Sequence, residues 1–127
     1  MSQVLRNVKA GAPMTLAWEK DTSGRWYTFA LHNIDFVHGT GVCVVWHEGD
    51  MPATVCVGHG DLAQCLHELH ENRAIRMYRK LGTMRFTWTE LPPVAQRGVA
   101  RYLSEQLKPA FEDIATLVPS IPVNLPE

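Results

Sequence analysis

The chain has 127 residues, of which 46% are hydrophobic, and its formal net charge is −1. This length and composition predict one folded domain over residues 1–127, with residues 1–13 as a loose N-terminal arm. No apolar run is long enough to span a bilayer and no secretory leader is visible, so we expect a cytoplasmic protein without a membrane partner.

The near-neutral total charge conceals two oppositely charged parts of the chain. Residues 73–108 hold eight basic and two acidic side chains, a net charge of +6, and the remaining residues carry −7. A chain that is polarised in this way can present one basic side to a polyanion.

The first half of the chain contains several candidate strands. Residues 14–20 are ambiguous between strand and helix. The aromatic content of residues 25–31 favours a strand, and residues 32–36 are either its end or a loop. Two Val-rich runs, residues 41–46 and 54–57, are separated by turn residues and predict a β-hairpin.

A bend and a helix are predicted directly after this hairpin. Gly58 and Gly60 favour a tight bend because they lack a Cβ atom. Asp61 is suited to cap the following helix, predicted over residues 61–71, in which apolar residues recur three and four positions apart.

The second half of the chain predicts helices around one strand. Residues 71–80 favour a second helix that Asn72 can interrupt, and residues 84–91 alternate as a strand with one exposed face. Residues 93–108 predict a longer helix, and residues 111–117 a short helical turn. Together these elements predict an α/β (α+β) layer fold in which helices flank a small mixed sheet.

Several groups of residues between positions 36 and 126 share the spacing of known motifs. They are Gly41-Val42-Cys43, Cys56-Val57-Gly58, Asp61-Leu62, Cys65-Leu66 with His70, Ala100-Arg101-Tyr102-Leu103, and Asn124. This arrangement resembles the GIY-YIG nuclease superfamily, in which the first two groups would be the signature triplets. The resemblance implies a GIY-YIG-like sheet with flanking helices.

The resemblance places a catalytic site at Cys43, Cys56, Cys65, His70 and Ala100. The two tyrosines of the family would be Cys43 and Cys56, its arginine Cys65, and its metal-binding glutamate Ala100. Phosphodiester hydrolysis needs a cation on the phosphoryl oxygens and a base for water, which these substituted side chains do not supply. The resemblance therefore implies a degenerate nuclease-like domain that binds nucleic acid or another polyanion without efficient cleavage.

An active enzyme is the alternative interpretation of the same resemblance. A rebuilt site would make the chain a phosphodiesterase or endonuclease that depends on magnesium or manganese. Whether the chain is an enzyme stays open at this stage, although the substitutions favour a non-enzyme.

Basic residues in the second half of the chain are the expected contacts to phosphate. The stripe over residues 73–80 has helical spacing, and the alternative interpretation is an ordinary solvated helix face. The full set of expected nucleic-acid-binding residues is Arg73, Arg76, Arg79, Lys80, Arg97 and Arg101.

The three cysteines admit more than one interpretation. The simplest is that Cys43, Cys56 and Cys65 are small buried side chains, and then no cofactor is expected. The alternatives are a thiol site, a Cys43–Cys56 disulfide across the hairpin, or tetrahedral zinc held by the three cysteines with His59 or His70. No C-x-x-C pair is present to favour zinc.

Overall fold

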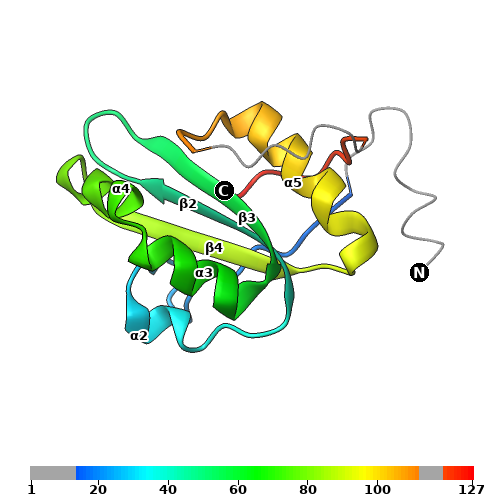
Figure 1. The fold of residues 1–127 in the computed structure, drawn as a ribbon, viewed down its shortest axis with the longest axis horizontal. Coiled ribbons are helices and arrows are strands. Elements are labelled where there is room, and N and C mark those ends of the chain that lie inside the picture. Colours follow the sequence, from blue (N-terminus) through cyan, green and yellow to red (C-terminus); the bar gives the residue numbers. More distant parts are fainter. Residues whose placement is uncertain (1–13, 112–118) are drawn as a thin grey trace.

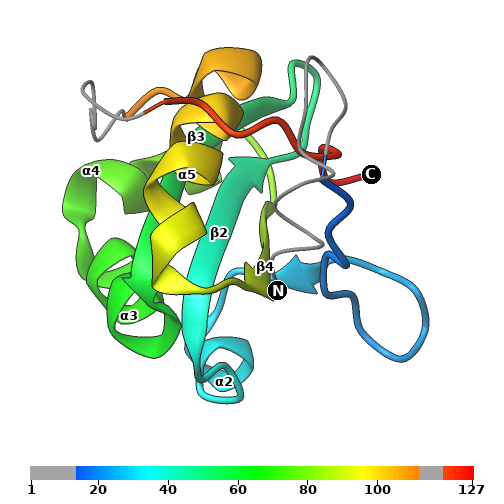
Figure 2. The same ribbon diagram turned by 90° about the vertical axis from the view of Figure 1, so that its right-hand side faces the viewer.

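A four-stranded sheet with helices on both faces forms the centre of the molecule (Figures 1 and 2). A computed structural model describes residues 14–111 and 119–127 of the chain. The predicted α+β class is confirmed. In chain order the elements are β1 (Tyr27–Thr28), α2 (Leu31–Ile34), β2 (Thr40–His47), β3 (Ala53–Asp61), α3 (Leu62–Glu71), α4 (Arg73–Arg76), the 3-10 helix η1 (Met77–Lys80), β4 (Met84–Glu90) and α5 (Pro93–Leu107).

The strand order in this sheet is β1-β4-β2-β3, and every neighbouring pair is antiparallel. The predicted hairpin is confirmed, because β2 pairs with β3 along its whole length. The predicted mixed sheet is corrected: β3 and β4 run in the same direction, but β2 lies between them. Among the described residues, parallel pairing is confined to the isolated bridges Met14–Val123 and Cys56–Phe111.

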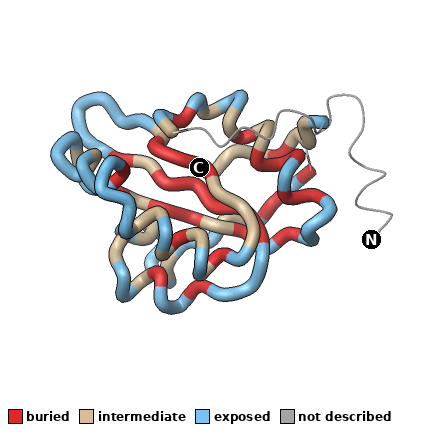
Figure 3. Tube along the Cα trace, viewed as in Figure 1, coloured by how far each residue is buried: buried red, intermediate tan, exposed pale blue. Residues whose placement is uncertain are grey.

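Each face of the sheet contributes to a separate hydrophobic core. Successive β2 side chains alternate, so that Cys43 and Val45 lie in the core beneath α3, whereas Val42 and Val44 lie in the core beneath α5. Figure 3 shows the central strands as largely buried and the outer loops as exposed. The sheet therefore separates the core beneath α3 from the core beneath α5.

The predicted bend after the hairpin is not a bend but the end of β3. Gly58, His59 and Gly60 all pair with residues of β2, and only Gly60 has a positive φ, of 112°. A Cβ atom on Gly58 would lie 2.5 Å from the Sγ atom of Cys65, so this glycine allows α3 to approach the sheet closely. The predicted cap is confirmed, because Asp61 accepts a hydrogen bond of 3.0 Å from the backbone of Gln64.

The strand predicted over residues 25–31 is mostly wrong. Only Tyr27 and Thr28 pair with β4, and the chain then turns into the short helix α2. The side chain of Asn33 donates a 2.8 Å hydrogen bond to the carbonyl oxygen of Thr28, which ties the first turn of this helix to the end of the strand. The backbone N–H of Phe29 still donates a 2.9 Å hydrogen bond to the carbonyl oxygen of Met84, and the turn into α2 after Ala30 then ends the contact with β4.

The later helices follow the predictions closely. Asn72 has an extended backbone and interrupts the helix between α3 and α4, and α5 ends at Leu107 before Lys108 adopts a positive φ of 49°. The helical turn predicted over residues 111–117 lies outside the described residues, apart from Phe111. The arm predicted over residues 1–13 also lies outside them. Within the described part, no helix is both long and apolar enough to span a membrane.

Candidate functional site

The three cysteines converge between the hairpin and α3. All of them belong to the core on the α3 side, and the Sγ atoms of Cys43 and Cys65 are 4.0 Å apart. Cys43 and Cys56 are buried, whereas Cys65 is partly exposed. No disulfide joins any of the three, so the Cys43–Cys56 disulfide is absent from this structure.

The environment of these thiols favours the protonated form of the two buried ones. The hydrogen bond with Cys65, followed by burial, raises the pKa of Cys43 well above its ordinary value. Burial, followed by the neighbouring Cys65, raises the pKa of Cys56 to about 12. Both side chains are therefore uncharged thiols at neutral pH.

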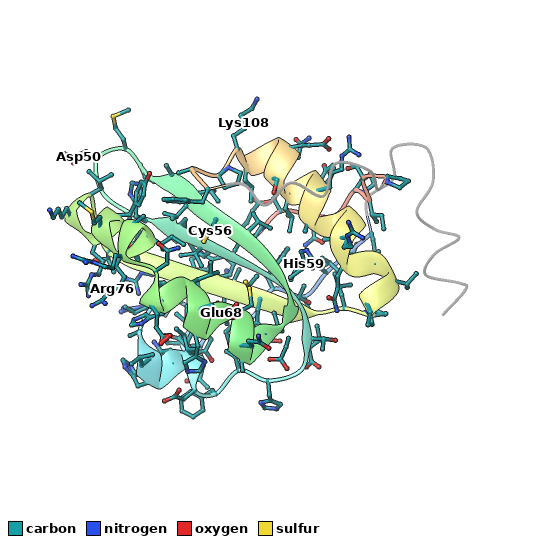
Figure 4. The ribbon with its side chains drawn as sticks, in the orientation of Figure 1. Asp50, Cys56, His59, Glu68, Arg76 and Lys108 are labelled. Atoms are coloured by element: carbon teal, nitrogen blue, oxygen red, sulfur yellow. The ribbon has the colours of Figure 1, made fainter. Side chains whose placement is uncertain are left out.

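His59 and the cysteines do not form the tetrahedral set that zinc requires. His59 and Cys65 border a hollow of about 360 Å³ on the outer side of β3, but Cys56 does not line it. Figure 4 shows Cys56 and His59 at separate points along β3. In residues 14–111 and 119–127, no group of three His, Cys, Asp or Glu side chains is arranged to hold a metal ion.

Ala100 does not join the cysteines, because the sheet lies between them. It is buried in the core on the α5 side, against Val42 and Val44 of β2, while Cys43 faces the opposite way. Sequence spacing alone could not assign α5 to a face. The five positions that the resemblance predicts as one catalytic site are therefore not one site in this structure.

His70 also lies apart from the cysteines, at the end of α3 near the basic residues. Its ring packs edge-on against Phe29, with a distance of 5.3 Å between ring centroids. Burial lowers the pKa of His70, and the charges of Arg76 and Arg79 lower it further. His70 is thus electrostatically coupled to α4 and η1.

Four of the six predicted phosphate contacts do form one group. Arg73 and Arg76 lie in α4, Arg79 and Lys80 lie in η1, and all four side chains are exposed. They border a hollow of about 460 Å³, and two of them border a second hollow of about 450 Å³ beside the end of β1. We call these four residues the basic surface. Within the described part of the chain, none of the four forms an ion pair.

Local contacts explain how α4 and η1 hold this arrangement. The side chain of Asn72 accepts a 3.2 Å hydrogen bond from the backbone of Ile75, which caps α4. Ile75 itself is only 2% exposed and anchors the helix in the core. The turn after η1 packs so tightly on the β2–β3 loop that a Cβ atom on Gly82 would lie 1.8 Å from the carbonyl oxygen of Glu48. In Figure 4, Arg76 and Asp50 of that loop lie at the same end of the molecule.

The other two predicted contacts lie on α5, on the opposite side of the sheet. Arg97 is exposed there, and Arg101 forms an ion pair of 3.2 Å with Glu105, one helical turn later. The six predicted contacts therefore form a group of four and a separate pair on the other side of the sheet. Helical periodicity predicts which residues share a helix face, but not which face of the sheet that helix covers.

No family model, curated protein or solved structure matches this chain. The resemblance to GIY-YIG nucleases thus stays a prediction from the residues themselves. The basic surface and the thiol pair are the features of this structure whose geometry bears on function.

An apolar hollow of about 250 Å³ on the α5 side of the sheet was not predicted from the sequence. Trp26, Trp46 and Leu107 help to line it, and the two indole rings meet edge-on with 5.3 Å between their centroids. The ammonium group of Lys20 lies 4.3 Å from the ring centroid of Trp26. The signal that was available is the position of Trp46 at the end of a Val-rich strand, where it packs partly buried against the core on the α5 side.

Proposed function

We propose that this domain binds nucleic acid through the basic surface and does not cut it efficiently, as a degenerate GIY-YIG nuclease-like domain. The observation that carries the proposal is the exposure of four cations on α4 and η1, beside two hollows, without an ion-pair partner among the described residues. Arg and Lys side chains in such positions are the usual contacts to phosphate oxygens. Another polyanion of similar charge density would meet the same four side chains.

The charges of these residues also favour an anionic partner energetically. Four like charges within residues 73–80 repel one another, and a phosphate backbone relieves that repulsion while it releases condensed counterions. If each cation contacts one phosphate, affinity should fall about 50- to 150-fold between about 50 and 200 mM salt. The lower figure applies to single strands and the higher one to duplexes.

The positions implied for catalysis support binding without cleavage. Cys65 cannot clamp a phosphate as a guanidinium would, and Ala100 cannot hold a metal ion. Ala100 also lies on the other side of the sheet from Cys43 and Cys65, so a carboxylate at that position would not complete a site with them.

The direct test is fluorescence anisotropy with labelled single-stranded and duplex DNA at two salt concentrations. The double variant Arg76→Gln/Arg79→Gln should lose at least about tenfold in affinity, because two phosphate contacts are removed. The control is Arg97→Gln, which removes one positive charge from the opposite side of the sheet and should change affinity little. The absence of binding at low salt, or an equal loss from Arg97→Gln, would reject the proposal.

A second candidate function is phosphodiester hydrolysis at a rebuilt site. One observation favours it: the lowered pKa keeps His70 neutral at pH 7, next to Arg76 and Arg79. A neutral imidazole beside two guanidinium groups combines a base with cations for the phosphoryl oxygens. A nuclease assay with magnesium or manganese should show cleavage that His70→Ala abolishes. Cleavage that survives His70→Ala, or the absence of cleavage, would reject this candidate.

A further inference from the structure

The Cys43–Cys65 pair has the features of a reactive dithiol, and these features are independent of the proposed function. Its two sulfur atoms are 4.0 Å apart, and the cysteines come from β2 and α3, 22 positions apart in the sequence. We propose that the pair is an oxidation site for a small hydroperoxide, at which Cys65 is oxidised first and Cys43 then closes an intramolecular disulfide.

The backbone beneath the pair is shaped to let the two sulfur atoms meet. A Cβ atom on Gly58 would lie 2.5 Å from the Sγ atom of Cys65 and 3.1 Å from that of Cys43. The glycine has no positive φ, so its conformation alone does not require glycine. Its missing side chain leaves the space that the two sulfur atoms occupy. A disulfide needs these sulfurs, which are 4.0 Å apart here, to approach to about 2.05 Å.

The two thiols differ in access. Cys65 is partly exposed and borders the 360 Å³ hollow together with His59 and Glu68, whereas Cys43 is fully buried. The hydrogen bond with Cys65, followed by burial, raises the pKa of Cys43, so the Cys43 thiol remains protonated at neutral pH. This division makes Cys65 the attacking sulfur and Cys43 the resolving one.

The lining of the hollow favours a neutral oxidant. Asp61 and Glu68 both border it, and their negative charges disfavour the entry of an anion. A hydroperoxide is uncharged at neutral pH and small enough for a hollow of about 360 Å³.

The chemical steps balance with the hydroperoxide as the only co-reactant. The Cys65 thiolate attacks one peroxide oxygen, the O–O bond breaks, and the other oxygen leaves as an alkoxide or hydroxide that takes up a proton. The resulting sulfenic acid is attacked by the Cys43 sulfur, the S–O bond breaks, and the hydroxyl group leaves as water with the Cys43 proton. Two thiols are oxidised, and one hydroperoxide is reduced to an alcohol, or to water when the oxidant is hydrogen peroxide.

The test is treatment of the purified full chain with hydrogen peroxide, followed by thiol counting and peptide mapping under non-reducing conditions. We expect an intramolecular Cys43–Cys65 crosslink and the loss of two of the three thiols. This readout needs no variant, so it does not depend on whether a substituted chain folds. A crosslink to Cys56, crosslinks only between two chains, or an unmodified Cys65 would overturn the proposal.

Variants then separate the roles of the individual residues. Cys43→Ser should stop the reaction at a sulfenic acid on Cys65, which dimedone traps. Gly58→Ala should leave that trapping intact but slow the crosslink at least about tenfold, because the added methyl group intrudes between the sulfurs. Cys56→Ser is the matched control and should crosslink at the wild-type rate. Loss of the crosslink in Cys56→Ser, or its persistence in Cys65→Ser, would contradict the assignment.

Discussion

Two histidines on α3, His67 and His70, illustrate how neighbouring residues acquire opposite electrostatic properties. The Nδ1 atom of His67 donates a 2.7 Å hydrogen bond to the carbonyl oxygen of Ala63, and its Nε2 atom lies 3.1 Å from the carboxylate of Asp35. The Ala63 carbonyl, followed by Asp35, raises the pKa of His67. Burial and the neighbouring guanidinium groups lower that of His70.

These shifts predict opposite contributions to stability as the pH changes. The raised pKa of His67 stabilises the fold fully below the unfolded pKa of about 6.5, and this contribution is lost as the pH rises through the folded pKa. The lowered pKa of His70 acts in reverse: its contribution is present above about 6.5 and is lost as the pH falls through the folded pKa.

Thermal melts between about pH 5 and 8 should resolve the two effects. His67→Gln should melt at a lower temperature relative to wild type at the acid end, because only the effect of His70 remains. His70→Gln should lose less stability on acidification than wild type does. Parallel pH profiles for wild type and both variants would show that neither histidine couples to folding.

At the scale of elements, the cap at Asn72 decides how the basic surface is presented. Without the hydrogen bond from Ile75, the short α4 loses its first-turn support, and isolated helices of this length are unstable in water. Asn72→Ala should cost about 1 kcal/mol in the free energy of unfolding and also weaken DNA binding several-fold. Urea denaturation and anisotropy would measure the two effects on the same protein.

Asp61→Ala is the matched control for that experiment. It removes the equivalent cap of α3, where the side chain accepts a hydrogen bond from Gln64, and should cost a similar free energy of about 1 kcal/mol. Its effect on DNA binding should be smaller, because α3 presents none of the four basic residues. Equal binding losses in the two variants would mean that global stability, and not the geometry of α4, controls binding.

At the scale of the whole molecule, Asn124 joins two segments that are far apart in the sequence. Its side-chain amide accepts a hydrogen bond from the backbone N–H of Leu16 and donates one to the backbone carbonyl oxygen of the same residue. The backbone carbonyl oxygen of Asn124 accepts a 2.9 Å hydrogen bond from the indole of Trp18. The same C-terminal segment runs alongside α5 in Figure 2, and Ile121 donates a 3.0 Å backbone hydrogen bond to Gly98. Asn124, one of the positions on which the resemblance depends, therefore has a structural role here.

Replacing Asn124 should consequently destabilise the fold. Asn124→Ala leaves two partly buried backbone groups of Leu16 without their partner, which should cost about 2 to 4 kcal/mol in the free energy of unfolding. Asn33→Ala is the comparison, since it removes one hydrogen bond at an exposed position and should cost about 1 kcal/mol or less. Urea denaturation of both variants gives the two values, and similar losses would contradict this role for Asn124.

Local patterns in the sequence were sufficient to predict most of the elements. The Val-rich hairpin, the Asp61 cap, the interruption at Asn72 and the alternating strand β4 all depend on residues close to one another in the chain. Side-chain periodicity and capping report on exactly such short-range interactions, so these predictions did not require knowledge of the tertiary structure. The strand predicted over residues 25–31 was mostly wrong, because aromatic content indicates only a preference and the chain turns into α2 after Ala30.

The candidate site was decided mostly by long-range packing. The sequence identified the cysteines and the basic stripe, but it placed Ala100 and Arg97 with them, and the structure puts α5 on the other face of the sheet. The contact between Cys43 and Cys65 likewise exists only because α3 packs on the face to which Cys43 points. Periodicity specifies the apolar face of a helix, but which side of the sheet that face covers depends on contacts between distant segments, and these arise only when the whole chain packs.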